Sequence, residues 1–158
     1  MKGDRALRAE LIRFLRTEGA HQSLADAVKN FPVKDINRRP PHVPYTFWHL
    51  LEHIRIAQWD ILDFIRDPDY QELRFPQDYW PARSAKATKK DWDETIARYH
   101  RDLDEMVALV KNPKTDLHAR IPHGDGQTVL REAILIIDHT SYHVGEFGIL
   151  RQVVNNWK

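Results

Sequence analysis

The fold is decided by the stretch Phe47–Arg66, which reads FWHLLEHIRIAQWDILDFIR. Its apolar side chains recur every three or four positions, the spacing that places them on one face of a helix. They are Phe47, Leu50, Leu51, Ile54, Ala57, Ile61 and Ile65. Thr46 is suited to cap the first turn, and the sequence Asp67-Pro68-Asp69 ends the helix. This stretch therefore predicts a long amphipathic helix that packs against others.

Three other long segments have a comparable helical period. They are residues 4–17, about 88–111 and about 128–154, and a shorter helical piece covers residues 23–30. Thr88 and Asp91 form a capping box before the third long helix, and Thr128 caps the fourth. No stretch alternates apolar and polar residues over a useful length. The sequence predicts an all-α fold, a four-helix bundle that forms a single domain over residues 1–158.

A long connection, residues 67–87, joins the second and third long helices. It is rich in aromatic residues and prolines, including Phe75-Pro76 and Tyr79-Trp80-Pro81. At about 20 residues it is longer than the usual connection between helices. It can cross the bundle from end to end, which allows the second and third helices to run parallel.

The composition excludes several classes of function. The chain has 158 residues and no cysteine, so disulfides, thiolate nucleophiles and cysteine-bound zinc are excluded. Its 24 basic and 23 acidic side chains nearly cancel, which argues against nucleic acid or an acidic membrane as a partner. The first residues, MKGDRALR, lack the apolar core of a signal peptide, and no apolar run approaches the about 20 residues of a membrane span. We therefore expect a cytoplasmic protein.

The last helix contains DHTSYHVGEFGILR at residues 138–151, in which two histidines are four residues apart. On a helix, His139 and His143 point from one face with their Cβ atoms roughly 6 Å apart, close enough to share one cation. On a helical wheel they lie about 100° and about 60° from the centre of the apolar face. Both are therefore edge positions, where a side chain meets a cleft and is backed by the core. Glu146 lies one turn further along the same edge.

A third ligand is available on the second long helix, where His49 and His53 compete. His53 lies about 100° from the centre of the apolar stripe and His49 about 140°. The geometry therefore favours His53 as the inward-facing imidazole and leaves His49 nearer to solvent. Three neutral imidazoles from two helices make an open site for zinc or a related divalent ion, with positions left for water or substrate. Histidines that only fill helix edges are the alternative and, from spacing alone, the commoner one.

Two other motifs carry less weight. His49-Leu-Leu-Glu-His53 matches the H-x-x-E-H signature of a class of zinc peptidases, in which Glu52 would be the general base. Such enzymes need a further carboxylate ligand and a substrate groove built from a far larger chain. Gly124-Asp125-Gly126 lacks the length and charge spacing of a phosphate or calcium loop. It therefore predicts a turn before Thr128.

The sequence resembles the DinB-like superfamily of four-helix bundles over most of its length. The resemblance is carried by WHLLEHIRIAQWD at residues 48–60, GQTVLREA at 126–133 and DHTSYHVGE at 138–146. Ala20-His21 and Tyr79-Trp80-Pro81 are similar to further recurring segments of that family.

The resemblance implies that a divalent metal is held by His53, His139 and His143, in an up-down-down-up bundle that forms homodimers. Relatives carry out metal-dependent thiol transfer, hydrolysis or isomerisation. It therefore implies a thiol S-transferase or a hydrolase that acts on a small molecule. Zinc or nickel is the expected metal, with iron or manganese as alternatives, and a low-molecular-weight thiol is a further candidate cofactor.

Glu146 marks a departure from the family pattern, which often reads His-x-Gly-Gln where this chain has His143-Val-Gly145-Glu146. Glu146 could be a fourth ligand, a base beside the metal or a surface charge. Glu146 and Tyr142 are the candidate catalytic residues, and His49 is a further candidate for moving protons. Two alternatives to an enzyme stay open. One is a metal-dependent, small-molecule-binding stress-response module, and the other is a structural dimeric bundle.

Overall fold

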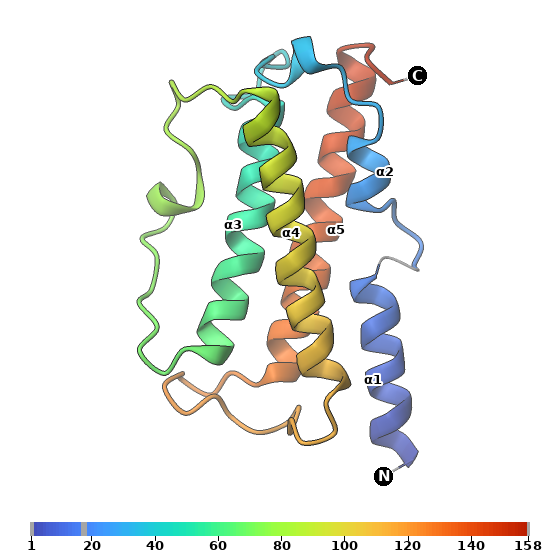
Figure 1. The fold of residues 1–158 in the computed structure, drawn as a ribbon, viewed down its shortest axis with the longest axis vertical. Helices are drawn as coiled ribbons and strands as arrows, with labels where there is room; N and C mark the ends of the chain where they lie inside the picture. The colour runs from blue at the N-terminus through green and yellow to red at the C-terminus, as the bar shows by residue number, and fades with distance from the viewer. Residues whose placement is uncertain (1, 17–18, 158) are drawn as a thin grey trace.

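The computed structural model describes residues 2–16 and 19–157, and its main elements are five α-helices (Figure 1). They are α1 (Lys2–Leu15), α2 (Leu24–Val28), α3 (Phe47–Arg66), α4 (Lys89–Lys111) and α5 (Val129–Val153), with short 3-10 helices η1 (Val33–Asp35) and η2 (Gln77–Tyr79). Over these ranges there is no strand, only one isolated bridge between Arg120 and Thr128. The predicted all-α fold is confirmed.

The starts of the long helices follow from local capping. The Thr46 hydroxyl accepts a hydrogen bond from the His49 amide, and the Thr88 hydroxyl accepts one from the Asp91 amide. Thr128 caps α5 in the same way. All three predicted caps are therefore confirmed. They could be predicted from the sequence because a cap depends only on residues within one turn of it.

The N-terminal helical segments differ slightly from their predicted bounds. α1 ends at Leu15, and the predicted end at residue 17 lies outside the described residues. The short helix α2 covers only Leu24–Val28, with Ser23 as its cap. Asn30 follows with a positive φ of 52°, a conformation that ends a helix.

Contacts between helices show their directions. Near the start of both α3 and α4, Trp48 Nε1 donates a hydrogen bond to Thr95 Oγ1, and near their ends Arg66 pairs with Glu105. The two helices therefore run parallel. Figure 1 shows the 67–87 connection returning along the outside of α3 to make this possible.

α1 and α5 run the other way. Arg8 Nη1 donates to the Val110 carbonyl near the end of α4, whereas Arg16 pairs with Asp104 further back. α5 passes α3 in the opposite direction, since Tyr45, just before α3, reaches Glu146 near the end of α5.

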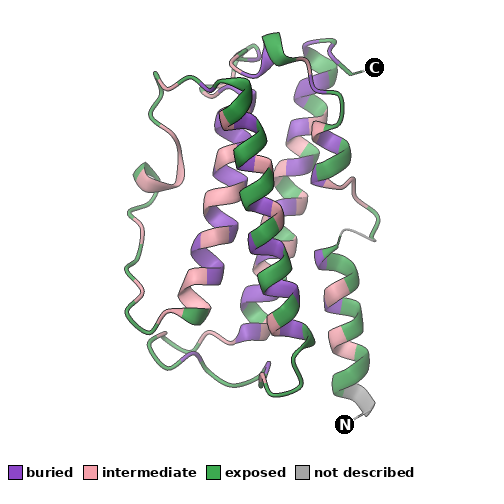
Figure 2. Cartoon of the chain, viewed as in Figure 1, coloured by how far each residue is buried: buried purple, intermediate pink, exposed green. Residues whose placement is uncertain are grey.

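The core lies where α3, α4 and α5 face one another (Figure 2). Phe47 and Leu50 of α3, Met106 of α4 and Phe147 of α5 are all fully buried. Burial of each such side chain contributes about 1.5–3 kcal/mol. This packing fixes the depth of α5 against α3 and thereby sets which of their edge residues meet. No helix within residues 2–16 and 19–157 combines the length and apolar character of a membrane span.

Candidate metal centre

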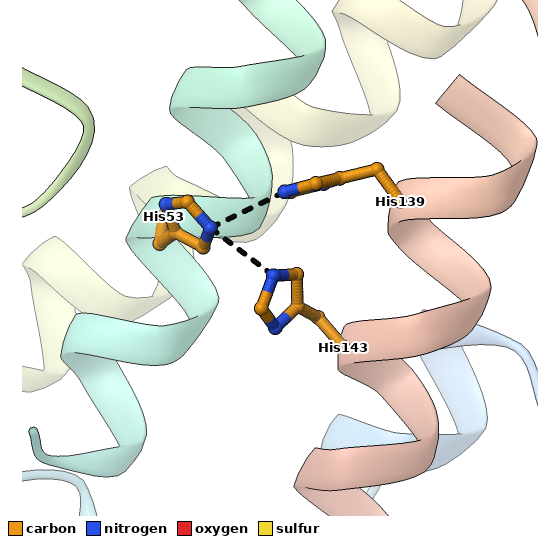
Figure 3. Close-up of side chains that lie close together, drawn as sticks. All are labelled: His53, His139 and His143. Atoms are coloured by element: carbon orange, nitrogen blue, oxygen red, sulfur yellow. Dashed lines mark hydrogen bonds between the residues drawn. The ribbon is translucent and has the colours of Figure 1, made fainter. Parts of the chain in front are cut away.

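Three histidines converge in the groove between α3 and α5 (Figure 3). His53 of α3 is 5% exposed, and its Nε2 lies 3.2 Å from the Nε2 of His143 and 3.2 Å from that of His139. The three candidate ligand atoms all lie within 4.8 Å of one another. The predicted meeting of His53, His139 and His143 is confirmed.

The far nitrogens of two of these rings have acceptor partners. His53 Nδ1 lies 2.9 Å from the carbonyl oxygen of Tyr79, which can only accept a hydrogen bond. His143 Nδ1 lies 2.7 Å from Glu146 Oε2. Each Nδ1 therefore carries the hydrogen and donates it, which leaves a lone pair on each Nε2.

With these tautomers, the Nε2 atoms of His53 and His143 face each other with no hydrogen between them. Two Nε2 lone pairs that face each other at 3.2 Å repel unless a cation lies between them. With Zn–N bonds of about 2.0–2.1 Å, two ligands of a tetrahedral ion are about 3.3 Å apart. The observed spacing therefore fits a shared divalent ion.

A proton does not take the place of that cation at neutral pH, because the pKa values of all three rings are lowered. Burial, followed by the neighbouring rings of His139 and His53, lowers the pKa of His143 to about 3. Burial and then His53 lower the pKa of His139 to about 4, and burial also lowers the pKa of His53. At neutral pH all three imidazoles are thus neutral, the form in which histidine binds metals.

Glu146 is placed behind His143, away from the point where the three Nε2 atoms meet. One of its oxygens accepts from His143 Nδ1, and the other accepts from the Tyr45 hydroxyl. Burial raises the pKa of the Glu146 carboxyl. Its contacts are those of a residue that orients His143, an arrangement common behind metal-binding histidines.

Tyr142 lies at the rim of the site. Its side chain is 70% exposed, and its ring meets the His143 ring edge to face with centroids 4.8 Å apart. It therefore borders the space in front of the histidines, where an incoming molecule would pass.

The expectation that His49 lies nearer to solvent is wrong, because its residue is only 2% exposed. His49 Nε2 lies 3.0 Å from the Ala85 carbonyl, and its Nδ1 accepts a hydrogen bond from the Thr46 amide. The 67–87 connection covers this side of α3, so His49 is buried although it lies far from the apolar stripe of the helix.

Two aromatic residues of the site were not assigned a role there from the sequence. The Trp80 ring stacks on the His53 ring at 3.9 Å with an interplanar angle of 6°, and Tyr45 stacks in turn on Trp80. The density of aromatic residues and prolines at 75–81 was the available signal. The contact of Trp80 with His53 depends on the path of the connection, which has no sequence period.

A cavity of about 610 Å³ opens in front of the histidines. Its walls are mainly apolar and aromatic, contributed by α3, α5 and the 67–87 connection. They include Ala57, Ile61, Phe75, Trp80, Leu135 and Tyr142. A cavity of this size accommodates a small molecule next to the convergent nitrogens.

The model of the DinB superfamily matches residues 16–147, which include all three histidines and Glu146. The chain belongs to the DinB superfamily. No curated protein and no solved structure matches it. The matched range thus contains the whole three-histidine cluster.

Proposed function

We propose that this DinB protein is a metal-dependent enzyme that acts on a small molecule, with His53, His139 and His143 as the metal ligands. The observation that carries the proposal is the convergence of three Nε2 atoms, two of which have their tautomer set by a partner at Nδ1. Three protein ligands leave positions open, as in catalytic rather than structural sites. Zinc or nickel is the first choice of metal, followed by iron or manganese.

The reaction class that we propose is thiol S-transfer or hydrolysis. A divalent ion in this site would favour ionisation of a bound thiol or water and polarise an electrophile. Since the chain has no cysteine, a thiol nucleophile would be a separate low-molecular-weight cofactor. Glu146 would hold His143 in its binding orientation, Trp80 would keep water from His53, and Tyr142 would position the incoming molecule.

Metal content tests the first part of the proposal. The protein would be purified without a polyhistidine tag, and its metal measured by mass spectrometry. We expect close to one equivalent in the wild type, the same in the control His118→Ala, and almost none in His143→Ala. His118 is a suitable control because it is exposed and lies outside the cluster. Equal metal in the two variants would contradict the assignment of the ligands.

Turnover tests the second part. Thiols would be paired with small electrophiles, and simple esters and amides would be tested separately, with and without a chelator. We expect activity that the chelator removes and the bound metal restores. Metal binding without turnover of any compound would instead favour a small-molecule-binding module. Activity that survives complete removal of the metal would contradict a metal-dependent enzyme.

A further inference from the structure

The cavity at the histidines adjoins a second chamber of about 390 Å³. Asp60, Ile61, Tyr79 and Leu135 line both spaces, so the two form neighbouring parts of one groove between α3 and α5. Asp60 lies seven residues after His53 on α3, which corresponds to roughly 10 Å along the helix axis. The groove therefore suits an elongated molecule with one end at the histidines.

The second chamber differs from the first in its charge. Four carboxylates line it, those of Asp60, Glu72, Asp125 and Glu132. The only arginine in its lining, Arg131, pairs with Glu132 at 2.6 Å and has a side chain that is 57% exposed. Within the described part of the chain, no salt bridge reaches the other three carboxylates. The chamber therefore has an excess of negative charge.

Of the two buried carboxylates in this set, Glu132 is paired with Arg131, and Asp60, with 6% of the residue exposed, is not. Its two oxygens accept hydrogen bonds from the hydroxyls of Tyr70 at 2.8 Å and Tyr79 at 2.6 Å. Burial and the neighbouring Asp60 carboxylate raise the pKa of both tyrosines, so both hydroxyls remain donors. Each carboxylate oxygen can accept a further bond. A buried carboxylate without a cation is unfavourable, so this position favours a cationic ligand.

A second feature of the chamber, separate from the carboxylates, is a hydrogen-bond acceptor without a donor in the described part of the chain. The side-chain oxygen of Gln127 is buried and lacks a hydrogen-bond partner among the residues that the structure describes. Gln127 lines the same chamber and comes from the turn before α5. An ammonium group offers three N–H donors, so it can serve the Asp60 carboxylate and still has a donor for a further oxygen.

We propose that the second chamber binds the protonated amine of an elongated small molecule whose other end reaches the three-histidine site. The substrate or thiol cofactor is thus an amine-bearing molecule, held by Asp60 and surrounded by the carboxylates of Glu72 and Asp125. The placement of the other end rests on the proposed metal site. The binding of the amine itself needs only the second chamber.

The first experiment uses the cobalt-loaded protein and straight-chain thiols that end in an amine, a hydroxyl or a carboxylate. The thiolate-to-cobalt absorption band reports binding at the histidines. For chains that span about 10 Å, we expect the amine to bind at least about tenfold tighter than the hydroxyl, the effect of one charge-assisted hydrogen bond. For shorter chains the two should bind equally. Equal binding at every length, or tightest binding of the carboxylate, would overturn the proposal.

Variants assign the preference to the chamber. Asp60→Asn should remove the advantage of the amine over the hydroxyl-ended thiol of the same length. The double variant Glu72→Gln/Asp125→Asn should reduce the advantage of the amine. Both of its residues are exposed, so we expect this variant to fold and to test the chamber even if Asp60→Asn does not fold. Asp93→Asn/Glu94→Gln on α4 is the control, because it removes the same charge outside the chamber. An equal loss in the two double variants would show a general charge effect and contradict the site.

A second experiment separates this proposal from the metal site. The metal-free protein would be titrated with a straight-chain alkylamine and with the alcohol of the same length, and amide chemical shifts would be followed. We expect shifts around Asp60 and Tyr79 that saturate with the amine, not with the alcohol, and that are absent in the chamber variants. If no metal binds but this result holds, the metal proposal fails and the amine site stands. If the amine and the alcohol behave alike, the amine site fails whatever the metal does.

Discussion

His49 and His53 lie one turn apart on α3, are both buried, and both contact carbonyls of the same connection. They differ in how many of their ring nitrogens form hydrogen bonds with the backbone. At His49 one nitrogen faces the Ala85 carbonyl and the other accepts from the Thr46 amide, so both are used by the backbone. At His53 only Nδ1 is used, and Nε2 points at the histidines of α5.

This difference separates a structural histidine from a candidate ligand better than burial does. Burial lowers the pKa of both rings and keeps both neutral, so charge does not distinguish them. What distinguishes them is the presence of a lone pair that no backbone group occupies. Variants at the two positions should therefore fail in different ways.

The largest effect is expected for His53→Ala. It removes one of three ligands, and we expect the affinity for zinc or cobalt to fall at least about a hundredfold, beyond the effect of losing a residue that only orients a ligand. Competition with a chromogenic chelator measures this affinity. The helical content, followed by circular dichroism, should remain. Stoichiometric metal with unchanged affinity would show that His53 is not a ligand.

His49→Ala should retain the metal and lose stability. The change removes the capping partner of Thr46 and leaves the Ala85 carbonyl without its donor, at a cost of roughly 2–4 kcal/mol. Chemical denaturation of the metal-free protein measures it, with His118→Ala as the control. If His49→Ala lost metal as fully as His53→Ala, the contrast between the two histidines would be wrong.

A smaller effect is expected for Glu146→Gln, which keeps an acceptor for His143 Nδ1 and removes the charge. We expect metal binding to weaken about tenfold, as for other residues that orient a ligand. Glu94→Gln on α4 is the control. Complete loss of metal would instead identify Glu146 as a fourth ligand, and no change would show that the Glu146 charge does not support metal binding by His143.

A further effect is expected in the metal-free protein, a pH dependence of its stability. His139 and His143 have pKa values of about 4 and about 3, below the roughly 6.5 of an unfolded chain. The folded protein therefore binds fewer protons, and this stability is complete above about pH 6.5 and is lost as the pH falls towards 4 and 3. The loss should be roughly 1 kcal/mol per pH unit for each histidine.

Chemical denaturation at pH 7 and pH 5 should show this loss of stability. A shallower pH dependence in the double variant His139→Ala/His143→Ala would assign the loss to these two histidines. The same slope in that variant would contradict the assignment.

Much of the fold could be predicted because its signals are local. Thr46, Thr88 and Thr128 each cap a helix through a residue three positions later, and the apolar period continues from there. The histidines could be chosen by facing angle because a helix fixes the direction of each side chain. The exposure of His49 could not be predicted in this way, since the Ala85 carbonyl that covers it is 36 residues away.

The sequence by itself determined the helices, their starts, and which histidines lie on the edges of α3 and α5. Only the tertiary structure decided what each ring nitrogen does, because the partners of His49 and His53 are backbone carbonyls on an irregular connection. It also decided that Glu146 supports His143 from behind and that Asp60 joins two chambers. These roles depend on the relative depth of packed helices, which no local spacing encodes.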